Sequence, residues 1–172
     1  MQKFLAALQS ALAAIAIQPL VLFCWALLPL LLQGADLPWH QVGLMCLMAM
    51  IFAAPFALFL GIPLALLLQR IDRFKWWPLA LVGAVAGAVF VGYSGPGSDP
   101  GASYGGNWYG KYVDFVIDGK PTLYGWLQYA QSVLAFALHG FIGASAFYLA
   151  WVRQMGPNQS FKRTCGPRPT CS

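Results

Sequence analysis

The chain has 172 residues, of which 59% are hydrophobic and 9% are charged. Because roughly a quarter of the residues in soluble domains are charged, this composition argues against a water-soluble fold and indicates that lipid is the solvent. The formal net charge is +5, and all five acidic residues are aspartates.

Four apolar segments predict four transmembrane helices, at residues 11–33, 42–68, 77–93 and 126–152. Each reaches or nearly reaches the ~20 residues that cross a ~30 Å hydrocarbon core. The N-terminus imitates a secretory signal, but its apolar run continues to Leu32, which is too long for a signal core. We therefore expect an uncleaved first helix. The predicted fold is all-α, an antiparallel four-helix transmembrane bundle formed by residues 1–153.

Small residues recur within these segments at helical spacing. Lipid supplies no hydrophobic drive for helix association, so close approach between small residues must bring the helices together. The predicted packing residues are Ala49, Ala53, Ala57, Gly61, Ala65, Gly83, Gly87, Gly140 and Ala144. The same pattern can mark homodimerisation, which leaves the oligomeric state open.

Prolines interrupt the first two predicted helices, at Pro19, Pro29, Pro55 and Pro63. Each removes a backbone donor, so we expect both helices to bend.

A long loop, residues 94–122, joins the third and fourth predicted helices. Its first part, residues 94–110, is rich in glycine and predicts irregular surface chain. Residues 112–117 then alternate between two faces, and Asp118-Gly119 favours a type I′ turn, so this part predicts a short β-hairpin. Its aromatic side chains are expected to form an interaction surface: Trp108, Tyr109, Tyr112 and Phe115.

Basic residues are distributed unevenly between the two sides of the predicted bundle. Eight lie in the N-terminal, central and C-terminal segments, whereas the long loop holds only Lys111 and Lys120. The positive-inside rule then places both termini in the cytoplasm and the loop outside. Topology thereby accounts for the net positive charge, and nucleic-acid binding is not expected.

Of the polar residues inside predicted spans, Gln18, His139 and Ser145 are selected as a possible intramembrane site. Counting from the outer boundary places Gln18 and His139 at the same depth, so we expect them to face each other. Intramembrane ionisable residues often mark proton relays or ligand sites. A lone imidazole can also simply hydrogen-bond a neighbouring amide, and this packing role is favoured over ion or substrate passage.

In size and in having four spans and four cysteines, the chain resembles the periplasmic disulfide-forming quinone reductases. Those enzymes hold their cysteines in outward-facing pairs, whereas Cys24 and Cys46 lie in predicted spans and Cys165 and Cys171 in the tail. Lipoprotein signal peptidases and small multidrug exporters are also four-span proteins, but their paired aspartates and essential intramembrane glutamate have no counterpart here. No catalytic residue, metal site or cofactor is expected.

The tail, residues 154–172, is rich in Pro, Gly, Ser and Thr and predicts a disordered cytoplasmic segment. Its sequence "PNQSFKRT" resembles the tails of proteins from bacterial mobile gene cassettes. This resemblance implies a bacterial accessory gene, and with the topology above it implies the inner membrane.

Two functional hypotheses follow. The first is a non-catalytic inner-membrane accessory protein, protective in role, that contacts a membrane or periplasmic protein through its long loop. The alternative is a small oligomeric transporter or channel with a path past His139 and Gln18. An enzyme ranks last, because no nucleophile and base share a depth.

Overall fold

The computed structural model describes residues 2–32, 38–71, 74–97 and 99–155, and the predicted tail lies almost wholly outside them. The chain divides into two compact units. Unit 1 comprises Met1–Ala80 and Ile142–Ser172, and unit 2 comprises Leu81–Phe141. Each unit is described separately below.

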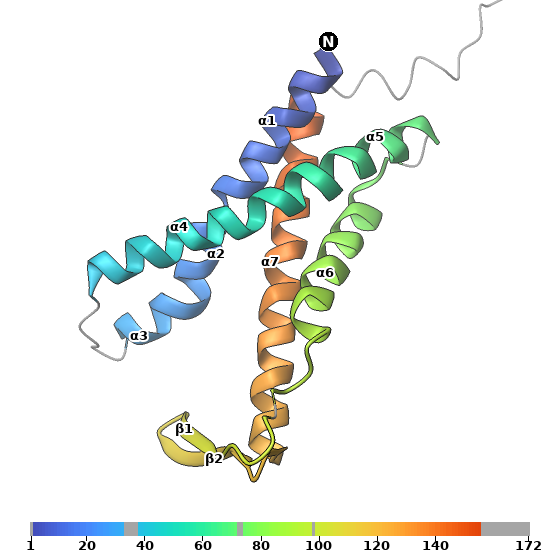
Figure 1. Ribbon diagram of the computed structural model, residues 1–172. Helices are drawn as coiled ribbons and strands as arrows, with labels where there is room; N and C mark the ends of the chain where they lie inside the picture. Colours follow the sequence, from blue (N-terminus) through green and yellow to red (C-terminus); the bar gives the residue numbers. More distant parts are fainter. Residues whose placement is uncertain (1, 33–37, 72–73, 98, 156–172) are drawn as a thin grey trace, which may run out of the picture. The chain divides into compact units, whose positions relative to one another are not determined.

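Unit 1 consists of helical segments (Figure 1). In chain order they are α1 (Gln2–Ala16), α2 (Gln18–Leu22), the π-helical turn η1 (Phe23–Leu27), α3 (Leu28–Leu32), α4 (Trp39–Pro55), the π-helical turn η2 (Phe56–Gly61) and α5 (Ile62–Arg70). The start of α6 (Trp76–Gly92) and the end of α7 (Leu123–Met155) complete this unit.

Within the described part of the chain, three helical stretches are long and apolar enough to cross a membrane: Phe4–Leu27, Trp39–Arg70 and Leu123–Met155. In the second of them only 6% of the apolar window is buried within the molecule, so most of its side chains are exposed on the surface. Helix α6 is shorter, at 17 residues. Hydropathy therefore located all four helices, and the coarser expectation of a mostly helical chain with long apolar helices agrees with the structure.

The first helix begins at Gln2, well before the predicted residue 11. The added segment contains Gln, Lys, Ala and Leu, all strong helix formers, although its polar residues lower the hydropathy. Its small residues are among the most buried of unit 1: Ala7, Ser10 and Ala11 are each 0% exposed. The spacing of Ala7, Ala11 and Ala14 was visible in the sequence, but Ala7 precedes the expected span, and Ala11 and Ala14, which lie within it, were not selected as packing residues.

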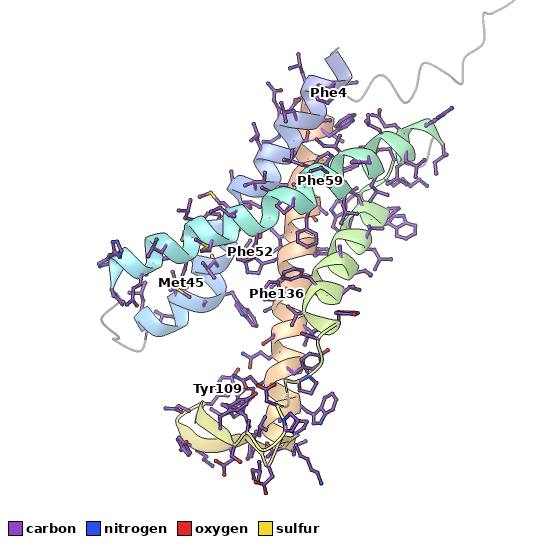
Figure 2. All side chains as sticks on the ribbon, in the orientation of Figure 1. Phe4, Met45, Phe52, Phe59, Tyr109 and Phe136 are labelled. Carbon is purple, nitrogen blue, oxygen red and sulfur yellow. The ribbon has the colours of Figure 1, made fainter. Side chains whose placement is uncertain are left out.

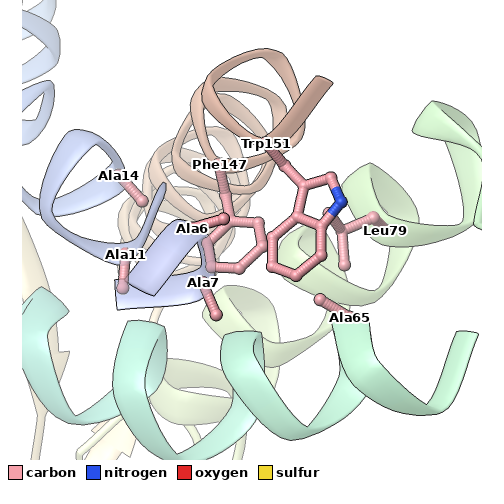
Figure 3. Close-up of a cluster of buried hydrophobic side chains, with 8 residues drawn as sticks. All are labelled: Ala6, Ala7, Ala11, Ala14, Ala65, Leu79, Phe147 and Trp151. Carbon is pink, nitrogen blue, oxygen red and sulfur yellow. The ribbon is translucent and has the colours of Figure 1, made fainter. Parts of the chain in front are cut away.

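The core of unit 1 combines these alanines with two aromatic rings of α7 (Figure 3). The ring of Phe147 stacks on that of Trp151, with centroids 6.2 Å apart and planes 13° apart. Ala65 of α5 and Leu79 of α6 belong to the same cluster. Alanine faces thus let the helix backbones come near large rings, which supply most of the buried volume.

The π-helical turns of the first two long helices have the same local cause. Leu28 precedes Pro29, and its N–H donates to the carbonyl of Phe23, five residues back. Ile62 precedes Pro63, and its N–H donates in the same way to Ala57. A proline has no N–H for the carbonyl four residues back, so the preceding turn widens into a π-helical turn.

Unit 2 is a helical hairpin formed by the adjoining parts of α6 and α7, with a small sheet between them in the sequence. The two helices meet where glycines remove side chains. A Cβ atom on Gly87 would collide with the carbonyl oxygen of Phe136, and one on Gly140 would collide with that of Gly83. The earlier residue of α6, Gly83, meets the later residue of α7, Gly140, and the later residue of α6, Gly87, meets the earlier residue of α7, Phe136. The two helices are therefore antiparallel.

The sheet has three antiparallel strands in the order β1 (Tyr104–Trp108), β2 (Lys111–Ile117) and β3 (Lys120–Pro121). Two-residue turns, Tyr109-Gly110 and Asp118-Gly119, join them, and all four turn residues have positive φ, as type I′ turns require. The predicted hairpin is confirmed.

The expectation of irregular chain throughout residues 94–110 is wrong, because β1 lies within it. Its glycines have low β-propensity, which hid the strand. The ring of Phe115 lies across Gly106, where a Cβ atom would be 2.9 Å from the ring, so a neighbouring aromatic side chain supplies the packing that glycine lacks.

Candidate functional site

Hydrogen bonds of Thr122 join the sheet to the first turn of α7. The Thr122 hydroxyl donates to the Asp114 carbonyl at 2.6 Å, and its N–H donates to the Phe115 carbonyl at 2.9 Å. The same hydroxyl oxygen accepts the N–H of Gly125 at 3.2 Å, which caps the helix. One side chain therefore binds β2 and starts α7.

Two further contacts hold this end of unit 2 together. The carbonyl of Phe115 lies so close to Gly125 that a Cβ atom there would collide with it. The Tyr129 hydroxyl donates to the carbonyl of Gly92 at 2.6 Å and satisfies a terminal acceptor of α6. The position of the sheet on α7 is thus determined by backbone groups as well as side chains.

The strand register divides the sheet into two chemically different faces. Directly paired residues share a face, and Gly106 pairs with Val113 while Trp108 pairs with Lys111. By alternation the apolar face carries Trp108, Val113, Phe115 and Ile117, flanked by Lys111 and Lys120. The opposite, more polar face carries Tyr104, Asn107, Tyr112 and Asp114, together with Val116, which is buried.

The predicted interaction residues occupy different environments. Tyr109 is 81% exposed and Tyr112 is 77% exposed, whereas Trp108 is half-buried. Phe115 is only 6% exposed, so its ring forms part of the sheet's own core and is not a surface residue as expected. Trp108 links the two environments, because its ring makes edge contacts with Tyr109 and Phe115. Tyr104, which sequence reasoning did not select, is 50% exposed.

Tyr109 has an unusual backbone conformation for its residue type. Its φ is +47°, in the left-handed region that favours Gly, Asn and Asp. The matching position of the other turn is Asp118, a favoured residue, with φ +49°. Tyr109 thus carries a conformational cost of about 1 kcal/mol without being buried in return, and such outliers often mark functional positions.

The three residues of the possible intramembrane site, Gln18, His139 and Ser145, have separate surroundings. The Gln18 amide donates to the Ala14 carbonyl at 3.1 Å, and it fills the space left by the missing side chain of Gly143. Ser145 accepts the indole N–H of Trp76 at 3.1 Å. His139 is half-buried beside Phe136, with ring centroids 6.4 Å apart. Gln18 and His139 belong to different units, and their predicted proximity stays a prediction.

The predicted packing residues fall into two groups. The five predicted residues of the second span are all partly or fully buried, and they lie in unit 1 with Ala144: Ala49, Ala53, Ala57, Gly61 and Ala65. Gly83, Gly87 and Gly140 lie in unit 2, at the contact between α6 and α7. Their roles in stability are addressed by the variants proposed below.

The cysteines and acidic residues give no metal site among the residues that the structure describes, where no three His, Cys, Asp or Glu side chains gather. Cys24 is exposed and Cys46 half-buried, and both are free thiols. Cys165 and Cys171 lie outside the described residues.

Comparison with known proteins gives no relative: no protein-family model, no curated protein and no solved structure matches the chain.

Proposed function

We propose that the chain is a multi-pass protein of a bacterial inner membrane, with four spans, cytoplasmic termini and a periplasmic sheet. Three long apolar helices and the excess of basic residues outside the sheet-bearing loop support this placement. Helix α6, at 17 residues, extends for about 25 Å at 1.5 Å per residue and serves as the short fourth span.

The protein acts by contact rather than by catalysis, as an accessory protein with a protective role. The observation that carries this proposal is the anchored sheet, whose tyrosines are exposed while Thr122 holds its position. Tyrosines presented on a rigid element are typical of binding surfaces, because few rotamers are lost on contact. On the polar face, Tyr104, Asn107 and Tyr112 form the surface offered to a membrane or periplasmic protein.

A complementation experiment tests this function. Cells lacking the gene are compared with cells expressing the wild-type chain or the variant Tyr104→Ser/Tyr112→Ser, under a panel of envelope stresses, toxins and phages. We expect the variant to reach the membrane in normal amount but to lose the protection. Full protection by the variant would contradict a role for the sheet, and the matched control is Lys75→Ser, which lies outside it.

Transport past His139 and Gln18 is the second candidate. The observation that supports transport is the burial of a polar side chain: Gln18 is buried and packs against Gly143 of α7. However, the Gln18 amide already bonds to its own helix at Ala14, as expected of a packing residue. If the chain carries a substrate flux in proteoliposomes and His139→Ala abolishes it, transport would be favoured over protein contact as the function.

A further inference from the structure

The sheet is amphipathic in a way that its role in protein contact does not use. On the apolar face Ile117 is 49% exposed, and Trp108 and Val113 are half-buried. Lys111 and Lys120, both exposed, flank this face, whereas Asp114 lies on the opposite one. The basic side chains therefore accompany the apolar surface, and the carboxylate of β2 is directed away from it.

The attachment to α7 determines where this face lies. The hairpin of β1 and β2 projects sideways from the foot of α7 (Figure 1). The first turns of α7 already display exposed apolar and aromatic side chains, Leu123 at 73% and Trp126 at 52%. This is the composition of a helix entering the interfacial layer of a bilayer. A sheet anchored there and projecting sideways runs along the membrane surface.

We propose that the apolar face of the sheet rests on the lipid headgroup layer of the bilayer that α7 crosses, with the Tyr109 ring inserted between headgroups. The proposal rests on the membrane placement given above. Lys111 and Lys120 extend their alkyl chains along the apolar surface and place their ammonium groups at lipid phosphates. The polar face, with Tyr112, then points away from the membrane and stays accessible to a protein partner.

This arrangement explains why a tyrosine occupies the first turn in spite of its positive φ. Its side chain lies on the side of the hairpin from which α7 rises (Figure 2), and its ring contacts Trp108 of the apolar face, with centroids 5.1 Å apart. Amphipathic rings are favoured at the boundary between headgroups and acyl chains. A tyrosine at the tip of the hairpin is long and amphipathic enough to reach that boundary. The shorter Gly, Asn or Asp, which adopt positive φ more readily, would not reach it.

Site-directed fluorescence tests the proposal. The four cysteines are replaced by alanine, and single cysteines are introduced as Tyr109→Cys, Ile117→Cys, Tyr112→Cys and Leu134→Cys. Each full-length chain carries an environment-sensitive fluorophore in vesicles of zwitterionic and anionic phospholipids. Quenching is measured with aqueous iodide and with lipids spin-labelled near the headgroup. Leu134, in α7 and 68% exposed, reports on the span itself.

The expected result separates the two faces. Labels at 109 and 117 are quenched by spin-labelled lipid and are several-fold less accessible to iodide than the label at 112. Equal iodide quenching at 109, 117 and 112, with 134 protected, would overturn the proposal and leave the membrane placement intact. Iodide quenching at 134 as well would overturn both.

A third outcome identifies a different occupant. Labels at 109 and 117 that are shielded from iodide yet unaffected by spin-labelled lipid would show that protein covers this face, which also contradicts the proposal. Circular dichroism of each variant confirms the helical content.

A pair of variants tests the role of the Tyr109 ring. Tyr109→Phe retains the aromatic ring, so a label at 117 should stay shielded from iodide. In Tyr109→Asn the ring is lost, and the label at 117 should become accessible to iodide.

Discussion

Glycines bring helices together in both units, but against different neighbours. In unit 1 a Cβ atom on Gly61 would lie 3.7 Å from the ring of Phe147, an ordinary contact distance. In unit 2 Gly140 and Gly87 face the backbone carbonyls of the opposite helix, with no room for a Cβ atom. The same small-residue pattern therefore describes a tolerant contact in one unit and an intolerant one in the other.

The difference lies in what can move. A phenyl ring can rotate or shift within its packing, whereas a helix carbonyl moves only if the two helices separate. Unit 2 adds polar contacts at Thr122 and Tyr129, whereas the core of unit 1 consists mainly of alanines and two stacked rings. Unit 2 should therefore be more sensitive to single-atom changes than unit 1.

The largest effect is expected for Gly140→Ala. The added methyl group would collide with the Gly83 carbonyl, so the helices must separate at a cost of about 3 kcal/mol. Unfolding of the purified protein in mixed micelles, followed by circular dichroism, measures the loss. The matched control is Gly43→Ala in α4, because nothing lies within 4 Å of its missing side chain. Equal stability of the two variants would show that α6 and α7 do not meet here.

A smaller loss is expected for Thr122→Val, which keeps the shape of the side chain but removes its hydroxyl group. The bond to Asp114 and the helix cap are lost together, which should reduce the free energy of unfolding by about 1–2 kcal/mol. Thr122→Ser should recover most of it. Hydrogen exchange at the amide of Gly125 provides a local measurement, and unchanged protection in the valine variant would refute the cap.

Tyr109→Asn should stabilise the sheet. Asparagine adopts positive φ readily, so the variant gains about 0.5–1 kcal/mol at the turn, as the comparison with Asp118 suggests. Hydrogen exchange of β1 and β2 measures the gain. Replacing Asp118 by tyrosine is the reciprocal variant and should lose a similar amount. A destabilised asparagine variant would mean that the Tyr109 ring contributes to the fold, against its 81% exposure.

The smallest effect is expected for Gly61→Ala. The methyl group would meet the Phe147 ring at van der Waals distance and restrict the unfolded chain, so stability should rise by a few tenths of a kcal/mol. Ala53→Leu, on the same face, provides the larger test of that face and should destabilise the protein by overpacking. If Ala53→Leu is neutral, the stripe of small residues contacts lipid instead of protein.

The sequence predicted the features that depend on local pattern. Hydropathy located the helices, and Asp118-Gly119 with the alternation before it located β2 and its turn. Long-range neighbours could not be read in this way. Gly61 and Gly140 are alike in the sequence, and only the opposite helix distinguishes them. Strand β1 was missed because the ring that supports Gly106 belongs to another strand.

The candidate site was predictable to the same extent. Alternation identified two faces of β2, but which aromatic ring would be buried depended on how α7 meets the sheet, and Phe115 proved to be the buried one. The tyrosine at the first turn was also hidden, because its dipeptide lacks the Asp or Asn that usually indicates a type I′ turn. The spacing of the alanines in α1 was also legible, but Ala7 precedes the assumed start of the span, and Ala11 and Ala14 within it were not selected as packing residues.

The pairings of the sheet connect residues that are close in the sequence, all between Tyr104 and Pro121. Such low contact order permits fast folding, and hairpins form in about 1–10 μs. Ribosomes add about 5–20 residues per second, so the 33 residues of α7 take seconds to synthesise. The strands can therefore pair while α7 is still being made, and Thr122 joins them to the helix as soon as its first turn forms. The sheet can thus form during synthesis, independently of how fast the longer helices pack against one another.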